Sequence, residues 1–542
     1  MYKIFQIKMP LGFTPEELQE KIIKKTNILK IDICNIKILK KSIDARNKSN
    51  IFFIINAGVE LKSDAEIKLK SGVDWKIEKV SGDIPSNTKQ LNPNIKIINT
   101  PIIIGAGPAG LFAALSLAEN GLKPIIVERG NEVGKRVADI EEFKRTGILN
   151  TESNIQFGEG GAGTFSDGKL TTGIKDIRIN KILEIFCEAG APEEILYESK
   201  PHIGTDVLRN VIVNLRKRIV SLGGKFLFGT KFIDFETENN KIKNIIVIDR
   251  AGIKSKINTD TLIIAIGHSA RDTFEMLYSK NVEIISKPFS VGVRIEHKQL
   301  FINKSQYGKH FNHPSLGAAD YKLSMHLQNR RGVYTFCMCP GGYIVPASSE
   351  KNMLCINGMS EFKRDAVNSN SAILVGIAPK DITPEDVNDE RMRVFAGIEF
   401  QRKLESKAFD MGGGNYKAPV QLAEDFTKGI QTKQIKDVEP SYPMGYEMVD
   451  LSNIFPKFIN EALKEGLIEF DKRIDGFIGN GAVLIGAETR SSSPVRIIRG
   501  DNMQSNIEGI YPCGEGAGYS GGITSSAVDG MKAAERVMGN YM

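Results

Sequence analysis

Hydrophobic and polar positions in the first 90 residues follow the pattern of a small α+β domain. Thr14 followed by Pro15 marks the start of a helix that runs to about Lys25. Residues 33–43 and 50–61 are rich in apolar and β-branched side chains and predict two strands separated by a turn. A helix combined with short strands therefore predicts a separate module at residues 1–90.

A different pattern begins after a stretch rich in Ser, Pro, Gly and Asn at residues 81–94, which predicts a linker. Residues 95–104 end in an apolar run typical of a buried parallel strand. Residues 108–120 have helical spacing, Gly121 can end that helix, and residues 124–130 predict the next strand. The three segments together form a βαβ unit.

The remaining chain predicts a helix at residues 204–222, followed by three β-rich stretches that end near residue 267. Residues 280–440 have mixed patterns, and we expect them to form an inserted domain that faces the substrate. The chain closes with a strand, a glycine-rich turn and a helix at about residues 524–538.

The βαβ unit contains a dinucleotide-binding fingerprint. Gly105 allows a tight turn, Gly107 allows close approach of a diphosphate, and Gly110 allows close packing of helix on strand. Glu128 ends the second strand, where a carboxylate can bind ribose hydroxyls. The predicted cofactor contacts along this unit are Gly105, Gly107, Pro108, Ala109, Gly110, Glu128 and Arg129.

The fingerprint suits FAD and NAD alike, and a glycine-rich stretch at residues 156–169 favours FAD. Its glycines allow the backbone to lie against a flat ligand, whereas Phe157 and Phe165 are poor choices for a solvent loop. We expect Gly161, Gly163 and Thr164 to contact the cofactor.

A second glycine-rich stretch, residues 509–523, leads into the C-terminal helix. The N-terminus of this helix can stabilise the negative charge that a flavin gains at its N1–C2=O edge on reduction. Glu515 can bind the ribityl hydroxyls, although an ordinary helix with a glycine-rich entry would look the same. The predicted contacts here are Gly514, Glu515, Gly521, Gly522 and Ile523.

These observations predict an α/β fold. It comprises a small basic α+β domain at 1–90, a Rossmann-type FAD-binding domain in two parts at 95–279 and 441–542, and an inserted mixed α+β substrate domain at 280–440.

Composition supports an ordinary globular protein, with 41% hydrophobic and 25% charged residues among 542. The N-terminus does not resemble a signal peptide, and the longest apolar runs are too short to span a bilayer. Six cysteines are few for a disulfide framework, and we expect a cytoplasmic protein with no membrane partner.

The formal charge is concentrated in the N-terminal segment. Residues 1–100 hold 18 basic and 11 acidic side chains, a difference that equals the +7 of the whole chain. A basic module can attract nucleic acid, or it can be a lysine-rich solvated surface. We favour the second interpretation and do not expect nucleic acid to be the main partner.

The chain resembles a known group of flavoproteins, the uncharacterised bacterial FAD-dependent dehydrogenases, also called NAD(FAD)-utilising dehydrogenases, of the glutathione-reductase-like superfamily. The match covers almost the whole chain and is carried by seven motifs: GAGPAGLFAA at 105–114, FGEGGAGTFSDGKL at 157–170, AIGHSARD at 265–272, PFSVGVRIEH at 288–297, FCMCPGG at 336–342, ETRSSSPVRI at 488–497 and YPCGEGAGYSGGI at 511–523.

The resemblance implies an FAD domain with an inserted substrate domain, but no known substrate. It also implies a backbone contact to adenine at Phe232, which a packing role explains equally well, and close approach to the dinucleotide at Ala265 and Gly267. No second GxGxxG follows a strand, so the use of NAD(P)H as a reductant stays open.

Three side chains are candidates for catalysis beside the flavin. Arg294 can clamp a substrate carboxylate, and His297 can act as a general acid or base, unless both belong to a structural salt-bridge strand. His268 either lies near the cofactor or caps the following helix. Lys169 can meet an FAD phosphate or an acidic substrate.

Cysteine spacing argues against two common chemistries. No CxxC is present, so the redox dithiol of the disulfide reductases is predicted to be missing. Cys337 and Cys339 form a CxC pair, which we expect to be buried packing rather than a redox or metal site. One pair supplies too few ligands for structural zinc, so we predict no metal.

The main functional hypothesis is an FAD-dependent oxidoreductase acting on an unidentified small molecule, with hydride transfer to or from the flavin. The alternative is an FAD-containing RNA-modifying or RNA-binding protein that uses the basic N-terminal module.

Overall fold

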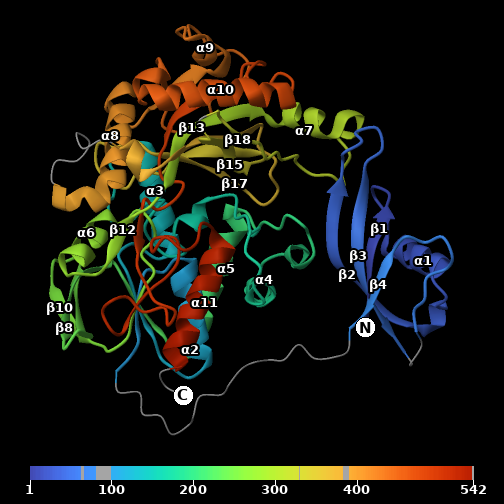
Figure 1. Ribbon diagram of the computed structural model, residues 1–542, viewed down its shortest axis with the longest axis horizontal. Helices are drawn as coiled ribbons and strands as arrows, with labels where there is room; N and C mark the ends of the chain where they lie inside the picture. The colour runs from blue at the N-terminus through green and yellow to red at the C-terminus, as the bar shows by residue number, and fades with distance from the viewer. Residues whose placement is uncertain (63–65, 81–98, 329, 383–389, 540–542) are drawn as a thin grey trace.

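The computed structural model describes residues 1–62, 66–80, 99–328, 330–382 and 390–539. Figure 1 shows an N-terminal domain at one side, a Rossmann-type domain, and a second domain built on a larger sheet. The linker predicted at residues 81–94 lies outside the described residues. The α/β fold expected from the sequence is confirmed.

The N-terminal domain is a four-stranded antiparallel sheet packed on one helix. The strands lie in the order β2 (Ile33–Asp44), β3 (Phe52–Leu61), β1 (Tyr2–Met9) and β4 (Lys76–Lys79). Helix α1 (Pro15–Lys25) begins where predicted, because the Thr14 side chain accepts a hydrogen bond from the Glu17 N–H and Glu17 completes a capping box.

A short main-chain bridge joins this domain to the rest of the protein. Lys41 N–H donates to the Tyr197 carbonyl at 2.7 Å, and Ser199 N–H donates to the Lys41 carbonyl at 2.8 Å. The Lys41 ammonium also lies 2.9 Å from the Glu198 carboxylate. The contact is made by β2, whose charged side chains are otherwise largely exposed.

A five-stranded parallel sheet forms the centre of the Rossmann-type domain. Its strands, in spatial order, are β23 (Ile510–Pro512), β11 (Leu262–Ile264), β5 (Ile102–Ile104), β6 (Ile125–Glu128) and β7 (Lys225–Phe228). The central strands β5 and β11 are buried throughout because both faces of the sheet are covered.

Alternation along these strands divides the core into two layers. Ile103 faces a layer of helices, namely α2 (Pro108–Glu119), α4 (Arg178–Glu188), α5 (Thr205–Ser221) and α11 (Ile523–Gly539). Ile102 and Ile104 face a three-stranded antiparallel sheet and helix α6 (Arg271–Ser279). The strands of that sheet are β10 (Lys254–Asn258), β9 (Lys241–Asp249) and β8 (Thr230–Glu238).

The second domain is built on a seven-stranded sheet. Its strands, in order, are β14 (Ser324–His326), β15 (Gly332–Cys339), β18 (Asn368–Ile377), β13 (Phe289–Lys298), β21 (Val483–Glu488), β19 (Ala418–Leu422) and β20 (Tyr446–Met448). A two-stranded sheet, β16 (Gly342–Pro346) with β17 (Ile356–Ser360), accompanies it. Its helices are α7 (Gln299–Tyr307), α8 (Ala396–Met411), α9 (Ala423–Lys428) and α10 (Lys457–Arg473).

The boundary expected at residue 440 is wrong, because β20 and β21 lie beyond it and belong to the seven-stranded sheet. The chain leaves the Rossmann-type domain through β12 (Ile284–Ser286) and returns through β22 (Val495–Ile497), and these two strands pair. An apolar strand such as β21 suits the centre of any sheet, so its sequence does not reveal which sheet it joins.

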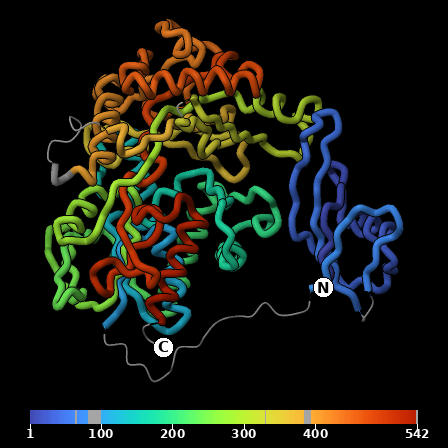
Figure 2. Tube along the Cα trace, viewed as in Figure 1, coloured from blue at the N-terminus to red at the C-terminus, as the bar shows by residue number. Residues whose placement is uncertain are grey.

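Helix α2 lies near the start of the Rossmann-type domain in sequence and α11 lies at its end, and the two helices pack side by side in the structure (Figures 1 and 2). A Cβ atom at Gly530 of α11 would lie 2.0 Å from the Ala109 carbonyl oxygen of α2. Glycine is therefore required at this crossing. None of the helices within the described ranges has both the length and the apolarity to cross a bilayer.

We expect Gly530→Ala to destabilise the fold by about 1–3 kcal/mol, because the added methyl group forces the two helices apart. The measurement is thermal denaturation followed by circular dichroism. Gly134→Ala is the matched control, since Gly134 also lies in a helix, α3 (Val133–Thr146), and a Cβ atom there would meet no neighbouring group within 4 Å. Alanine there should leave the stability unchanged or raise it by about 1 kcal/mol. Equal melting temperatures for the two variants would contradict the close-packing account.

Candidate cofactor site

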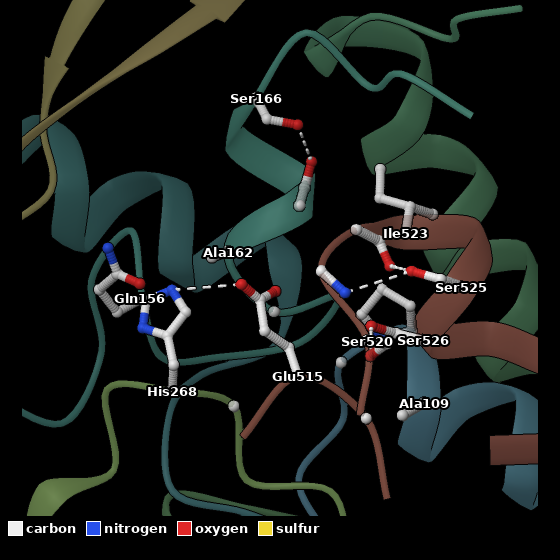
Figure 3. Close-up of a pocket in the computed structure, with 18 of the residues that line it drawn as sticks. Ala109, Gln156, Ala162, Ser166, His268, Glu515, Ser520, Ile523, Ser525 and Ser526 are labelled. Carbon is white, nitrogen blue, oxygen red and sulfur yellow. Dashed lines mark hydrogen bonds and ion pairs between the residues drawn. The ribbon is translucent and has the colours of Figure 1, made fainter. Parts of the chain in front are cut away.

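A cavity of about 1050 Å³ opens where α2 and α11 begin. Seven stretches that precede or follow the second domain in sequence line it: residues 104–109, 127–129, 156–174, 200–201, 230–232, 265–273 and 514–526. The second domain closes the other side, with Tyr321, Thr335, Phe336, Cys337, Met338, Asn357, Glu488 and Arg490 among its lining residues. Figure 3 shows His268 and Glu515 on one side of this space and Ile523 and Ser525 on the other.

Gly105 and Gly110 lie where a side chain would collide with neighbouring backbone at the start of α2. Gly105 has a φ of 101°, and a Cβ atom there would lie 2.4 Å from the Ala265 carbonyl oxygen. A Cβ atom at Gly110 would lie 1.9 Å from the Gly105 carbonyl oxygen. Gly105, Gly107, Pro108 and Ala109 line the cavity, whereas Gly110 packs behind it. The first turn of α2 therefore faces the cavity, where free N–H groups favour an anion.

Glu128 lies at the end of β6 in the cavity wall. One carboxylate oxygen accepts the Ala106 N–H and the other accepts the Gly130 N–H, each at 2.8 Å. These bonds hold the carboxylate at the predicted place, and its contact with ribose stays a prediction. Phe232, Ala265 and Gly267 also line the cavity, and Phe232 is at the same time part of the buried core.

Arg129 lines the cavity with its charge already paired. The guanidinium lies 2.7 Å from Glu152 and 2.9 Å from Asp272, and it stacks 4.2 Å from the centre of the Phe157 ring. These contacts tie the end of β6 to α6, so the expected contact of Arg129 with the cofactor does not involve a free positive charge.

A buried arginine that the sequence did not single out organises the glycine-rich loop. Arg136 of α3 is fully buried and donates to the carbonyl oxygens of Asn154, Ile155, Glu159 and Gly161 at 2.6–2.9 Å. Burial lowers the pKa of Arg136 to about 9, against the attraction of nearby carboxylates, so the side chain stays charged at neutral pH. The only sequence signal was an arginine on the apolar side of a helix.

The loop brings some of its predicted residues to the cavity and buries another. Gly161 and Gly163 line the cavity. A Cβ atom at Gly163 would lie 2.9 Å from Ile523 Cγ1, so this loop touches the start of α11. Thr164 does not line the cavity; its side chain is fully buried and its carbonyl oxygen accepts a hydrogen bond from the Thr205 hydroxyl at 2.7 Å.

The turn before α11 reaches the same cavity. Gly514 N–H donates to Asp529 at 2.8 Å, and Asp529 is held by Arg499 at 2.7 Å. This network fixes the glycine-rich turn against its own helix. All five predicted contacts line the cavity: Gly514, Glu515, Gly521, Gly522 and Ile523.

Two of the three catalytic candidates are not brought to the cavity. Arg294 is fully buried behind it and donates to Glu488 at 2.7 Å and to the Asn370 side chain at 2.9 Å. His297 is buried among aromatic rings, with Nε2 2.7 Å from the Phe477 carbonyl oxygen. Both predictions were wrong because β13 is a central strand covered on both faces, which strand alternation alone does not reveal.

His268 lines the cavity, as expected if it lies near the cofactor rather than capping the following helix. Its Nε2 lies 3.9 Å from a Glu515 carboxylate oxygen, and its Nδ1 lies 3.0 Å from the Ser269 hydroxyl (Figure 3). Burial, together with the charges of Arg490 and Arg271, lowers the pKa of His268 to about 3. The ring is therefore neutral at physiological pH and acts as a hydrogen-bonding group.

The pKa of Glu515 is shifted in the opposite direction, upward. Burial raises the pKa of Glu515 to about 7, with Cys337 adding to the effect and Lys287 opposing it. This carboxyl group therefore exchanges a proton near neutral pH. At neutral pH it is a better acid or base than His268, the histidine that the sequence offered for this role.

The comparison with known proteins decides the family. A protein of Clostridium beijerinckii (strain ATCC 51743 / NCIMB 8052), called an uncharacterized protein, is 46% identical over 544 residues and covers 99% of each chain. The chain belongs to the same family. Residues 288–491 match the family "FAD-dependent protein, C-terminal domain-like", and residues 103–160 match "NAD(P)-binding Rossmann-like domain". Residues 1–60 match a domain of unknown function.

The protein is thus a member of an FAD-dependent family, and FAD is its cofactor. The residues present fit this group. Glycine at 107 and 161 leaves backbone alone beside the first turn of α2, where a diphosphate binds. The cavity continues from there to the N-terminus of α11, and it is large enough for an extended dinucleotide.

Solved structures of other proteins resemble the chain more distantly. The quinol fumarate reductase of E. coli is 12% identical and covers 82% of this chain and 70% of that chain, with a TM-score of 0.36. The glycerol-3-phosphate dehydrogenase from Bacillus halodurans, complexed with FAD, is 13% identical and covers 84% and 64%, with a TM-score of 0.31. Similarity at this level carries no information about the reaction.

We expect Arg136→Met to weaken FAD retention about tenfold or more, because several buried carbonyl groups lose their partner at about 1–3 kcal/mol each. The measurement is the FAD-to-protein ratio after gel filtration, together with the dissociation constant of FAD from fluorescence quenching. Arg145→Met is the control on the same helix, since Arg145 is exposed and pairs only with Glu142 in the described contacts. FAD retention equal to that of the control would show that Arg136 does not hold the loop.

Proposed function

We propose that the protein is an FAD-dependent dehydrogenase that transfers hydride between a small organic substrate and the flavin. One observation carries the proposal: residues at the N-termini of α2 and α11 and residues of the second domain line a single cavity. NAD(P)H is a candidate reductant that binds in this cavity without a second Rossmann fingerprint.

The two ends of the cavity suit the two halves of the cofactor. Glu128 and Phe232 mark the adenosine side, and Gly522 and Ile523 mark the flavin side. The positive end of α11 favours the negative charge of a reduced flavin. FAD supplies the two-electron chemistry, and the chain's own residues position the substrate and manage protons.

The second domain supports a substrate site that is partly apolar. Phe336 and Tyr321 line it together with the charged side chains of Lys169, Lys322 and Glu488. Lys169 lies 3.0 Å from Asp167 and donates to the Met338 carbonyl oxygen, so it bridges the glycine-rich loop and β15. Such a mixture suits a small organic molecule with one polar or anionic end.

Proton transfer in this proposal depends on Glu515. Its raised pKa of about 7 keeps part of the carboxyl group protonated at neutral pH, and the neutral His268 ring lies 3.9 Å away. Glu515 donates a proton when the bound group becomes more negative, and it accepts one in the reverse direction.

We expect the rate of flavin reduction to fall about tenfold per pH unit above about pH 7, because the protonated Glu515 is the form that stabilises added negative charge. In Glu515→Gln this pH dependence should disappear, since glutamine stays neutral. The measurement is stopped-flow reduction by dithionite followed at the flavin absorbance. Glu508→Gln, an exposed change, is the control. A slope in Glu515→Gln equal to that of the wild type would remove Glu515 from the proton step.

The proposal as a whole is tested by an anaerobic screen. Purified protein should be yellow or take up added FAD, and bleaching of the flavin by NADH, NADPH or a member of a metabolite panel would identify the reductant. Correctly folded protein that stays colourless and binds no FAD would refute the proposal.

The alternative of an RNA-binding or RNA-modifying protein stays a prediction. Within the described ranges, the structure adds nothing that favours nucleic acid over a solvated lysine-rich surface for the N-terminal domain. Filter binding of tRNA that weakens steeply with salt would revive it.

A further inference from the structure

One cysteine of the CxC pair in β15 lies in the wall of the cofactor cavity. Cys337 and Met338 line the cavity, and Cys339 lies directly behind them, fully buried. The pairing of β15 with β18 shifts register between Phe336 and Cys339, and Cys337 has a φ of 42°. A bulge of this kind bends a strand and re-aims its side chains, and residues other than glycine rarely adopt a positive φ.

The bulge turns the Cys339 side chain back toward the backbone of Cys337. Cys339 Sγ lies 3.2 Å from the Cys337 carbonyl oxygen, which means that its side chain folds back over residue 337. Both cysteines are free thiols. In a regular strand, residues two apart are separated by about 7 Å along the chain, near the limit for a disulfide.

The surroundings shift the pKa values of the two thiols in opposite directions. A hydrogen bond from Cys339 lowers the pKa of Cys337 to about 5; burial opposes this shift, and the charges of Lys169 and Arg294 reinforce it. The same hydrogen bond, together with burial, raises the pKa of Cys339 above its ordinary range. Arg294 also donates to the Cys337 carbonyl oxygen at 2.6 Å. It therefore holds the bulged backbone in place, in addition to lowering the pKa of the Cys337 thiol.

Carboxylates from other elements also face the two cysteines, but each of them is paired with a basic side chain. Asp167 opposes the ionisation of Cys337, but it is itself paired with Lys169 at 3.0 Å and with Arg364. Glu488 of β21 is paired with Arg294 at 2.7 Å. Each nearby carboxylate of the glycine-rich loop and of β21 therefore has a basic partner.

Cys337 shares the cavity with the turn before α11, which the proposed function assigns to the flavin. Its negative charge contributes to the raised pKa of Glu515, which belongs to the turn before α11. Gly522 and Ile523, at the start of that helix, line the same space. Cys513 provides a contrast within the same turn: it is fully buried, does not line the cavity, and burial raises its pKa, as expected for a packing cysteine.

We propose that Cys337 and Cys339 form a redox-active dithiol that exchanges two electrons with the bound flavin, an inference that rests on the proposed function. Cys337 is the cavity-facing thiol and Cys339 is the partner thiol behind it. The proposal thus gives a redox role to the CxC pair, which was expected from the sequence to be buried packing.

The exchange balances within the protein. The Cys337 thiolate and the Cys339 thiol lose two electrons and one proton as the S–S bond forms. Oxidised FAD takes up those two electrons and the proton and becomes the reduced anion FADH⁻. In the reverse direction, FADH⁻ reduces the disulfide to a thiolate and a thiol. No further oxidant or reductant is required for the step itself.

The test is an anaerobic dithionite titration of air-oxidised, FAD-loaded protein. The wild type should take up about four electrons per FAD, two for the disulfide and two for the flavin. Cys337→Ser and Cys339→Ser should each take up about two. Cys187→Ser is the control, because Cys187 lies on α4 outside the cavity lining, and it should match the wild type.

A second measurement needs no variant. Alkylation of the wild type before and after reduction, followed by peptide mass spectrometry, should find a Cys337–Cys339 disulfide in the air-oxidised protein and two alkylated thiols after anaerobic reduction of the flavin. An uptake of about two electrons by the wild type with both thiols alkylated throughout would overturn the dithiol and leave the flavoenzyme standing. Failure to bind FAD would instead refute the proposed function.

Discussion

The cavity exists because backbone segments that are distant in sequence meet with no side chain between them. A Cβ atom at Gly105 would strike the end of β11, one at Gly110 would strike the Gly105 carbonyl group, and one at Gly530 would strike α2. A Cβ atom at Gly516 would lie 2.3 Å from the Gly267 carbonyl oxygen. These contacts bring the N-terminal ends of two helices to one space, and every functional inference depends on that convergence.

Buried ion pairs hold the second domain against the Rossmann-type domain. Arg271 of α6 and Arg490, which follows β21, both contact Glu405 of α8 at 2.7–2.9 Å. Glu405 is fully buried, yet the two arginines outweigh that burial and hold the pKa of Glu405 well below its usual range. Breaking such a network would leave an unpaired charge in the interior, so the domains are held in one orientation. The same arginines keep His268 neutral beside the cofactor.

Electrostatic roles in the cavity follow from burial more than from residue type. Histidine has an ordinary pKa near neutrality, which made His268 and His297 the natural candidates for proton transfer. Burial lowers the pKa of both rings, to about 3 and about 4, and raises the pKa of Glu515 to about 7. Glu515, which the sequence offered as a ribityl ligand, is therefore better suited to proton exchange than either histidine.

The sequence by itself determined the local parts: the helix cap at Thr14, the βαβ fingerprint from Gly105 to Glu128, and the glycine-rich entry to the last helix. These signals are local, because a cap, a turn or a positive φ depends on a few neighbouring residues. Only the tertiary structure decided that Arg294 and His297 lie behind the cavity, that Arg136 holds the loop, and that Cys337 enters the wall. The positions of Arg294, His297 and Cys337 depend on which strands become neighbours in the seven-stranded sheet, and that of Arg136 depends on how α3 packs against the glycine-rich loop. The spacing of apolar residues along the chain does not determine either choice.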